Sequence, residues 1–98
     1  MAYDLLIIVS QPASAAIAAP LARACNEAGV DWAIFFTNDG VTALEDAVLN
    51  ETLSGARSAI VCQEAWRRFM GDAPIPIESG SQTNLSAMAG EASRTLSL

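Results

Sequence analysis

Short apolar segments alternate with helical segments along this chain, and this alternation restricts its fold more than any other feature. Leu5 to Val9 is a continuous apolar run, which is typical of a strand covered on both faces. Asp31 to Thr37 and Ser58 to Cys62 are predicted as further strands, with helical segments between them. The pattern predicts a three-layer α/β/α fold with a mainly parallel sheet of about five strands. The 98 residues are expected to form one domain, 1–98.

The remaining elements are predicted from periodicity and turn residues. Helices are expected over about Ala13–Ala28, Val41–Asn50, Gln63–Met70 and Asn84–Gly90, with short strands at Ile75–Ile77 and Thr95–Leu98. Pro20 is expected to kink or split the first helix, because proline removes a backbone donor. The polar segment Ser79–Thr83 is expected to be a mobile loop.

The charge balance disfavours polyanionic partners. The net charge is −6, and the chain has five arginines and no lysine. Direct nucleic-acid binding and attachment to an anionic membrane both need clustered positive charge, so neither is expected. The first ten residues are too short to span a bilayer and do not have the pattern of an export signal. Two widely separated cysteines then suggest reduced thiols in the cytoplasm.

The composition also favours self-association. Hydrophobic residues make up 52% of the chain and charged residues only 16%. Because monomers rarely expose large apolar surfaces, an oligomer is expected. Ala65 and Phe69 are expected to face the core from the third helix. Trp66 and Met70 form a neighbouring stripe, which is either core or an interface with a partner or sister subunit.

Several kinds of chemistry lack their usual residues. Without histidine and with two distant cysteines, the chain has no recognisable zinc site, so no metal is predicted. No glycine-rich loop is followed by lysine, and the two cysteines do not form a Cys-x-x-Cys motif. No cofactor is therefore expected.

Cys62 is the candidate reactive residue. It is predicted to lie at the carboxyl end of a strand and at the amino end of a helix, where the helix dipole favours thiolate over thiol. The alternative is a small buried hydrophobic residue, the usual role of a free cysteine. Cys25 is predicted to be a core residue, because Ile17, Leu21 and Ala28 share its helical face.

Three predicted strand ends should bring polar residues to the same edge of the sheet as Cys62. The residues that follow these ends are Ser10–Gln11, Asn38–Asp39 and Cys62–Gln63, and Gln11, Asp39 and Gln63 among them are pocket candidates. Asp39 reads first as a helix N-cap, with a pocket role as the alternative, and Gly40 allows a tight turn beside it.

Charged residues follow Cys62 on the predicted helix. Glu64 lies four residues before Arg68, so these two are expected to pair along the helix surface. Arg67 lies on a different face and is a candidate to support an anion at the sulfur, or else a solvated surface residue.

Two segments resemble known motifs. Ile60-Val61-Cys62-Gln63-Glu64-Ala65-Trp66-Arg67-Arg68 resembles the cysteine motif of DsrE/TusD-type proteins, and Phe35-Phe36-Thr37-Asn38-Asp39-Gly40-Val41 resembles the strand-turn shared by the DsrE/DsrF/DsrH (TusD/TusC/TusB) group. The β-α-β order expected of this group covers nearly the whole chain, and the resemblance is closest to the cysteine-bearing type. It implies a DsrE-like fold of flavodoxin or Rossmann character.

The resemblance implies a cytoplasmic sulfur-relay role. Cys62 would carry sulfane sulfur as a persulfide between donor and acceptor proteins of rhodanese-like or TusA-like type, in sulfur oxidation or tRNA thiolation. It also implies a homo-oligomer, trimer or hexamer, or a hetero-oligomer with homologous subunits. Whether the chain is itself an enzyme stays open, since it would be a sulfurtransferase-like carrier if active.

Two other function classes compete with this one. The first is a non-catalytic DsrH/TusB-like assembly subunit or binding module in which Cys62 is inert. The second is a flavodoxin-like or receiver-like module. A receiver needs a lysine that the chain lacks, and a flavin domain would usually have a longer loop than Ser10–Ser14.

Overall fold

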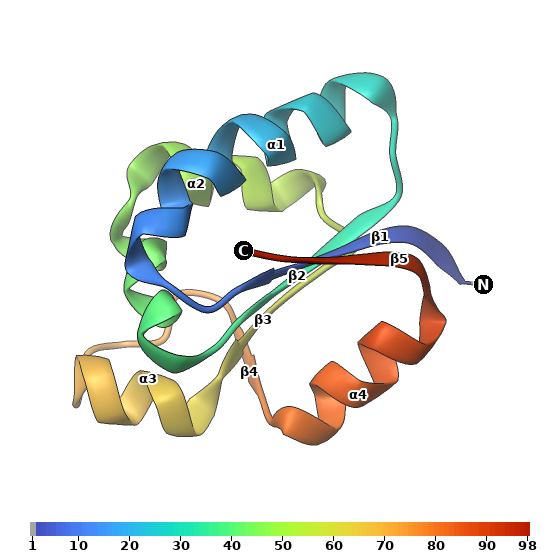
Figure 1. Cartoon of the computed structure of the whole chain (residues 1–98). Coiled ribbons are helices and arrows are strands. Elements are labelled where there is room, and N and C mark those ends of the chain that lie inside the picture. The colour runs from blue at the N-terminus through green and yellow to red at the C-terminus, as the bar shows by residue number, and fades with distance from the viewer. Residues whose placement is uncertain (1) are drawn as a thin grey trace.

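The computed structural model describes residues 2–98 and contains a five-stranded sheet of order β4-β3-β2-β1-β5, in which all neighbours are parallel. The strands are β1 (Tyr3–Val9), β2 (Trp32–Phe36), β3 (Ser58–Cys62), β4 (Glu78–Gly80) and β5 (Ala92–Ser97). The α-helices are α1 (Ala15–Ala28), α2 (Ala47–Thr52), α3 (Gln63–Met70) and α4 (Gln82–Glu91). Figure 1 shows α1 and α2 on one face and α3 and α4 on the other. The predicted three-layer α/β/α fold is confirmed.

The core is centred on β2, whose five residues are all buried. Trp32, Phe35 and Phe36 are among its largest fully buried side chains. This explains the continuous apolar sequence, because a central parallel strand is covered by helices on both faces.

Helix α1 differs from its prediction in two ways. It continues through Pro20 without a break, and Pro20 is exposed, so the carbonyl that loses its helical partner can bond to water. Its core face is also rotated: Ile17 is 58% exposed and Ala28 is exposed. The side chains buried along α1 are mostly alanines: Ala15, Ala18, Ala19, Ala22 and Cys25. Small side chains let the helix approach the sheet closely.

The predicted helix at Val41–Asn50 is two elements. A 3₁₀ segment, η2 (Asn38–Glu45), is followed by the short helix α2. Asp46 caps α2, since its carboxylate accepts a hydrogen bond from the Leu49 N–H at 3.0 Å. The expectation that Asp39 is an N-cap is wrong: Asp39 lies within the first turn of η2, and Thr37 precedes that segment.

The C-terminal third also departs from its prediction. The strand expected at Ile75–Ile77 instead forms at Glu78–Gly80, because Pro76 has no N–H for a ladder. The segment expected to be a mobile loop, Ser79–Thr83, contains the end of β4 and the start of α4. Helix α4 begins two residues before the predicted start at Asn84 and ends one after Gly90, and β5 spans Ala92–Ser97.

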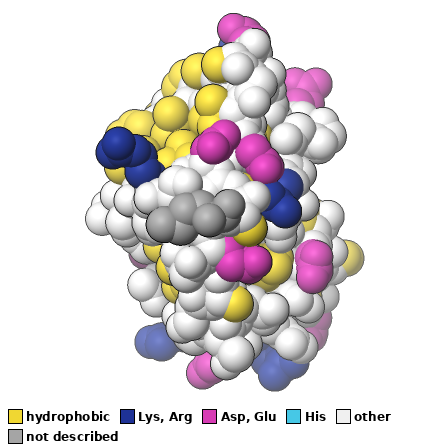
Figure 2. Space-filling view, turned by 90° about the vertical axis from the view of Figure 1, so that its right-hand side faces the viewer, with side chains coloured by type: hydrophobic (Ala, Val, Ile, Leu, Met, Phe, Trp, Pro, Cys, Tyr) yellow, Lys and Arg dark blue, Asp and Glu magenta, His cyan; other side chains and the backbone are white. Residues whose placement is uncertain are grey.

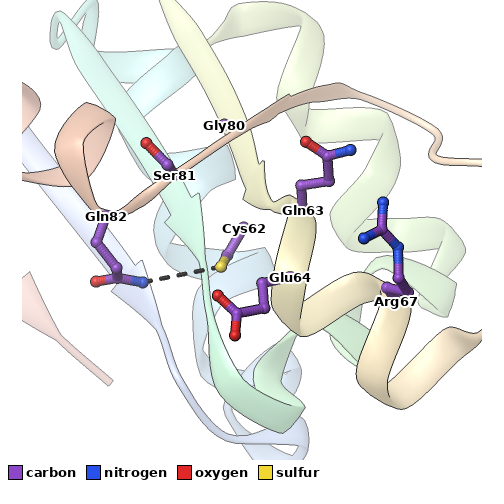
Figure 3. A pocket seen from close by; sticks show the side chains of 7 residues that line it. All are labelled: Cys62, Gln63, Glu64, Arg67, Gly80, Ser81 and Gln82. Carbon is purple, nitrogen blue, oxygen red and sulfur yellow. Dashed lines mark hydrogen bonds between the residues drawn. The ribbon is translucent and has the colours of Figure 1, made fainter.

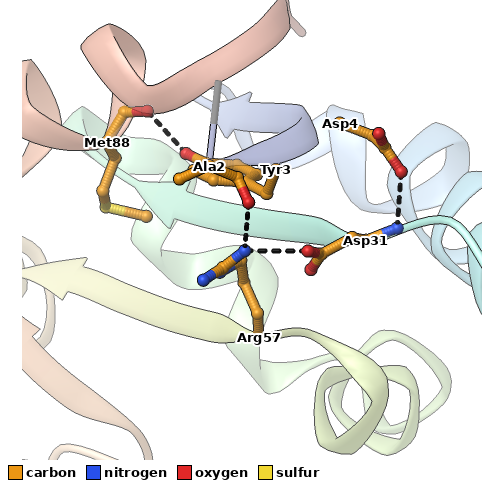
Figure 4. Close-up of polar contacts among 6 residues, drawn as sticks. All are labelled: Ala2, Tyr3, Asp4, Asp31, Arg57 and Met88. Carbon is orange, nitrogen blue, oxygen red and sulfur yellow. Dashed lines mark hydrogen bonds and ion pairs between the residues drawn. The ribbon is translucent and has the colours of Figure 1, made fainter.

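A polar cluster joins the amino ends of three strands (Figure 4). The Arg57 guanidinium donates to the Ala2 carbonyl at 2.9 Å and to Asp31 Oδ2 at 2.8 Å, and it lies over the Tyr3 ring. The Tyr3 hydroxyl donates to the Met88 carbonyl at 2.6 Å, and Asp4 accepts from the Asp31 N–H. These contacts fix the amino edge, opposite the edge where Cys62 lies.

Some apolar surface stays exposed on the single chain. The large exposed apolar side chains are Ile17, Val48, Phe69, Ile75 and Leu96. Figure 2 shows hydrophobic side chains gathered in its upper left part, on the side of the molecule that holds α1. Across residues 2–98, no helix combines the length and apolar character that crossing a bilayer requires.

Candidate functional site

The parallel register brings the carboxyl ends of the strands to one edge. Val9 lies beside Phe36, Phe36 beside Val61, and Cys62 beside Gly80. After β2 the chain turns toward the face of α1 and α2, and after β3 it enters α3 on the other face (Figure 1). Adjacent strands that diverge in this way leave a crevice between their carboxyl ends, which is the usual ligand position in open α/β sheets.

Cys62 lies in this crevice. It is the last residue of β3 and immediately precedes α3. The residue is 7% exposed, and its sulfur makes no capping hydrogen bond to the first turn of α3. Its Sγ accepts instead from Gln82 Nε2, at 3.8 Å. The position predicted from the sequence is therefore correct, but the side-chain partner comes from a different helix.

Two cavities are lined in part by Cys62. The larger has a volume of about 450 Å³ and the smaller about 210 Å³. Cys62, Glu64 and Gln82 line both. The larger is completed by Gln63, Arg67, Gly80 and Ser81, and the smaller by Thr37, Asn38, Ala65, Arg68 and Phe69. Cys62 is thus almost buried in the protein, yet it belongs to the walls of both cavities.

The larger cavity holds charges of both signs. Figure 3 shows the Glu64 carboxylate beside the sulfur in this view and the Arg67 guanidinium farther along α3, on the side of Gln63. The predicted ion pair between Glu64 and Arg68 does not form: Arg68 packs over the Phe69 ring at 5.5 Å, and the one ion pair within residues 2–98 joins Arg57 and Asp31. Glu64 therefore leaves a negative charge at the cavity that holds the thiol.

Three predicted pocket residues lie outside both cavities. Asp39 and Gln11 are exposed and line neither. Gly40 is buried against the end of β1, where an added Cβ would lie 2.5 Å from the Val9 carbonyl oxygen. Its function is close packing of η2 on the strand end. Asn38, with a φ of 51°, is the residue of this turn that reaches the smaller cavity.

The side chains of α3 are rotated relative to the prediction. Trp66 is 4% exposed and donates from Nε1 to the Ala73 carbonyl at 2.8 Å, so it belongs to the core and does not present an exposed interface. Met70 is half-buried against the core. Ala65 faces the core as expected, but Phe69 is 43% exposed and lines the smaller cavity.

Sequence reasoning missed the β4–α4 junction. Gly80, Ser81 and Gln82 line the larger cavity, but they lie in the segment expected to be a mobile loop. A signal was present: Ser81 and Asn84 form a capping box, in which the Asn84 side chain accepts from the Ser81 N–H at 2.8 Å. A serine three residues before a polar side chain is a helix start, and it would have placed Gln82 at the amino end of a helix.

The second cysteine is remote from this chemistry. Cys25 is 5% exposed within α1, and burial raises the pKa of its thiol. Both cysteines are free. The prediction that Cys25 is a core residue is confirmed, although Ile17 and Ala28 do not share its buried face.

The fold and the site together define a small parallel α/β domain with one cysteine at a strand end, facing a polar cavity. Within residues 2–98, no group of three or more acidic, cysteine or histidine side chains is arranged to hold a metal ion. No protein-family model matches the chain, and no curated protein matches it.

Proposed function

We propose that the chain is a sulfur-relay protein that carries sulfane sulfur as a persulfide on Cys62. The observation that carries this proposal is the cavity of about 450 Å³ that borders a free cysteine at a strand end. The resemblance of the Cys62 segment to the DsrE/TusD type, and of Phe35–Val41 to the wider DsrE/DsrF/DsrH group, supports the same function. Cys25 is excluded as the carrier because it lies in the core, away from both cavities.

The transfer is a displacement at sulfur that needs no external oxidant or reductant. The Cys62 thiolate attacks the outer sulfur of a donor persulfide, and a new sulfur–sulfur bond forms at Cys62. The sulfur–sulfur bond of the donor breaks, and its thiolate leaves. An acceptor thiolate then attacks the outer sulfur on Cys62 in the same way, which regenerates the Cys62 thiolate.

The site has room for this intermediate. A sulfur–sulfur bond is about 2.05 Å long, so the outer sulfur reaches only a short way beyond Cys62 Sγ. A cavity of about 450 Å³ can hold that atom together with the attacking group of a partner. Gln63 and Arg67 on the cavity wall offer polar contacts to the outer, anionic sulfur.

The partners are donor and acceptor proteins with exposed persulfide or thiol groups, of rhodanese-like or TusA-like type. We place the protein in the cytoplasm, where free thiols stay reduced. We also propose an oligomer, either of this chain or with homologous subunits, because apolar side chains such as Ile17 stay exposed. Light scattering on the protein as it elutes from a size-exclusion column would measure the molar mass of the assembly. The mass of a monomer at micromolar concentration would contradict the oligomer.

Two observations favour a second function. Cys62 is only 7% exposed and Glu64 adds a negative charge to its cavity. Both features slow thiolate chemistry, and both fit an assembly subunit of the DsrH/TusB-like type with an inert cysteine.

Loading with sulfane sulfur separates the two functions. The purified protein is incubated with a persulfide donor and its intact mass is measured. A relay protein gains the mass of one sulfur atom, and dithiothreitol removes it. Cys62→Ser abolishes the gain, and Cys25→Ser, the matched control, retains it. An unchanged mass for the native chain under conditions that load a known carrier would favour the assembly subunit.

A further inference from the structure

The Gln82 side chain connects two strand ends at the candidate site. Its Nε2 lies 3.3 Å from Thr37 Oγ1, just after β2, and 3.8 Å from Cys62 Sγ, at the end of β3. One amide nitrogen therefore donates its two hydrogens to two acceptors. The contact with Thr37 favours the amide orientation in which the same nitrogen faces the sulfur, and Figure 3 shows that nitrogen joined to the sulfur.

The backbone before Gln82 is held in place on the sulfur side. Gly80 pairs with Cys62 in the sheet, and a Cβ on Gly80 would lie 2.7 Å from Asn84 Oδ1 and 2.8 Å from Ile60 Cγ2. The capping box of Ser81 and Asn84 then starts α4 at Gln82. A strand pairing, a tight glycine and a helix cap thus place this one side chain in the crevice.

The chemistry of the contact suits an anionic sulfur. An amide N–H is a neutral donor that does not titrate, and its hydrogen bond strengthens when the acceptor carries a negative charge. Glu64 lines the same cavity and repels that charge, while no capping bond from α3 reaches the sulfur. Among the hydrogen bonds of residues 2–98, the one from Gln82 is the only one that Cys62 Sγ accepts.

We propose that Gln82 is a catalytic residue of the sulfur transfer, which it promotes by donating a hydrogen bond to the Cys62 thiolate and holding it toward the cavity. The inference rests on the proposed function and adds a residue from another helix to it. Gln82 transfers no proton and takes part in no bond change. It lowers the energy of the thiolate before attack and of the same thiolate when the outer sulfur leaves.

The test measures the Cys62 thiolate directly, before any sulfur transfer. In a Cys25→Ser background only Cys62 can react, and its alkylation by iodoacetamide is followed at neutral pH. Gln82→Leu replaces the amide with an apolar side chain of similar size. Gln82→Asn keeps the amide on a shorter side chain, which cannot reach the Cys62 sulfur. Thr83→Leu is the matched control, because Thr83 is an exposed residue in the same turn of α4 that lines neither cavity.

We expect Gln82→Leu and Gln82→Asn to slow alkylation roughly three- to tenfold, the range for the loss of one partly exposed hydrogen bond. The ultraviolet absorbance of the Cys62 thiolate should fall in the same two variants. Thr83→Leu should match the Cys25→Ser parent in both alkylation rate and thiolate absorbance. A purely structural Gln82 would change the unfolding midpoint without lowering the thiolate absorbance. Alkylation of Gln82→Leu at the rate of Thr83→Leu, or faster, would overturn the proposal.

The same samples separate this inference from the proposed function. If the native chain takes up no sulfane sulfur but Gln82→Leu still slows alkylation, the relay function fails and the hydrogen bond to the thiolate stands. If the native chain and Gln82→Leu take up sulfur at equal rates, Gln82 is not catalytic and the relay function stands.

Discussion

Gln82 and Cys62 are 20 residues apart in the sequence, yet the Gln82 amide nitrogen lies 3.8 Å from the Cys62 sulfur. The contact exists because β4 runs parallel to β3, so the chain that leaves β4 starts its helix beside the end of β3. The candidate site therefore depends on the pairing of β4 as much as on the cysteine motif. Weakening the β4–α4 junction should disturb the thiol before it disturbs the central sheet.

Removing the charge of Glu64 should make Cys62 more reactive. Glu64 lines both cavities that border the sulfur, and its carboxylate opposes a thiolate there. We expect Glu64→Gln to raise the rate of alkylation of Cys62 at neutral pH about two- to fivefold, the scale of one partly screened charge. Glu51→Gln, an exposed residue of α2, serves as the control and should leave the rate unchanged. A slower Glu64→Gln protein would mean that this carboxylate assists the thiol instead.

Removing the charge of Arg67 should have the opposite effect and make Cys62 less reactive. Its guanidinium lines the larger cavity, where it attracts an anionic sulfur. We expect Arg67→Gln to slow sulfur loading about two- to fivefold at low salt, with a smaller effect at high salt because added ions screen the attraction. Arg23→Gln in α1, outside both cavities, should load at the native rate. A loss in Arg67→Gln that is independent of salt would point to packing and not to charge.

Replacing Gly40 and Gly90 with alanine should change the free energy of unfolding in opposite directions. A Cβ at Gly40 would lie 2.5 Å from the Val9 carbonyl oxygen and 2.8 Å from the Gln11 nitrogen, both of them backbone atoms. Gly40→Ala should lower the free energy of unfolding by about 1–3 kcal/mol, as overpacking does. Gly90, within α4, has open space around its Cα, so Gly90→Ala should raise stability by about 0.5–1 kcal/mol. Urea unfolding of both variants measures the two values, and an equal sign for the two would contradict the packing argument.

Tyr3 should make the fold sensitive to alkaline pH. Burial, and next the nearby charge of Glu91, raise the pKa of the Tyr3 phenol. Above about pH 10 the unfolded chain loses this proton while the folded chain keeps it. The unfolded state then binds fewer protons, so the free energy of unfolding falls as pH rises. The raised pKa of the Cys25 thiol, which burial causes, acts in the same direction from a lower pH.

Tyr3→Phe tests this linkage, because Tyr3 is the single tyrosine of the chain. At neutral pH the variant's free energy of unfolding should be about 1 kcal/mol lower, because it lacks the hydrogen bond to the Met88 carbonyl. Above about pH 10 its free energy of unfolding should fall less steeply with pH than that of the native chain. Urea unfolding over a series of pH values measures both effects. An unchanged alkaline slope would show that the phenol does not contribute to it.

The central architecture could be predicted because it depends on local patterns. The apolar runs of β1, β2 and β3 are long enough, and the helix after Cys62 is distinct enough, to place that residue at a strand end. The side-chain faces could not be predicted. In α1 the alanines pack inward and Ile17 stays exposed, since close helix–sheet packing outweighed the size of the apolar side chain. In α3, Trp66 is buried because its indole N–H finds the Ala73 carbonyl, a partner set by the following loop.

The cavity walls were predictable only in part. Helix α3 follows Cys62 directly and carries both Gln63 and Arg67, so the segment that holds the motif also supplies these two residues of the cavity wall. Gln82 depends on the short strand β4, whose three residues include one glycine and have no apolar pattern. A strand of that kind is fixed by its pairing with β3 and not by its own sequence.

The most direct test of the account is the intact mass of the native protein, Cys62→Ser and Cys25→Ser after incubation with a persulfide donor. We expect the added mass of one sulfur atom, removable by dithiothreitol, on the native protein and on Cys25→Ser, and none on Cys62→Ser. Sulfur found on Cys62→Ser, or found on none of the three folded proteins, would contradict the claim that Cys62 carries it.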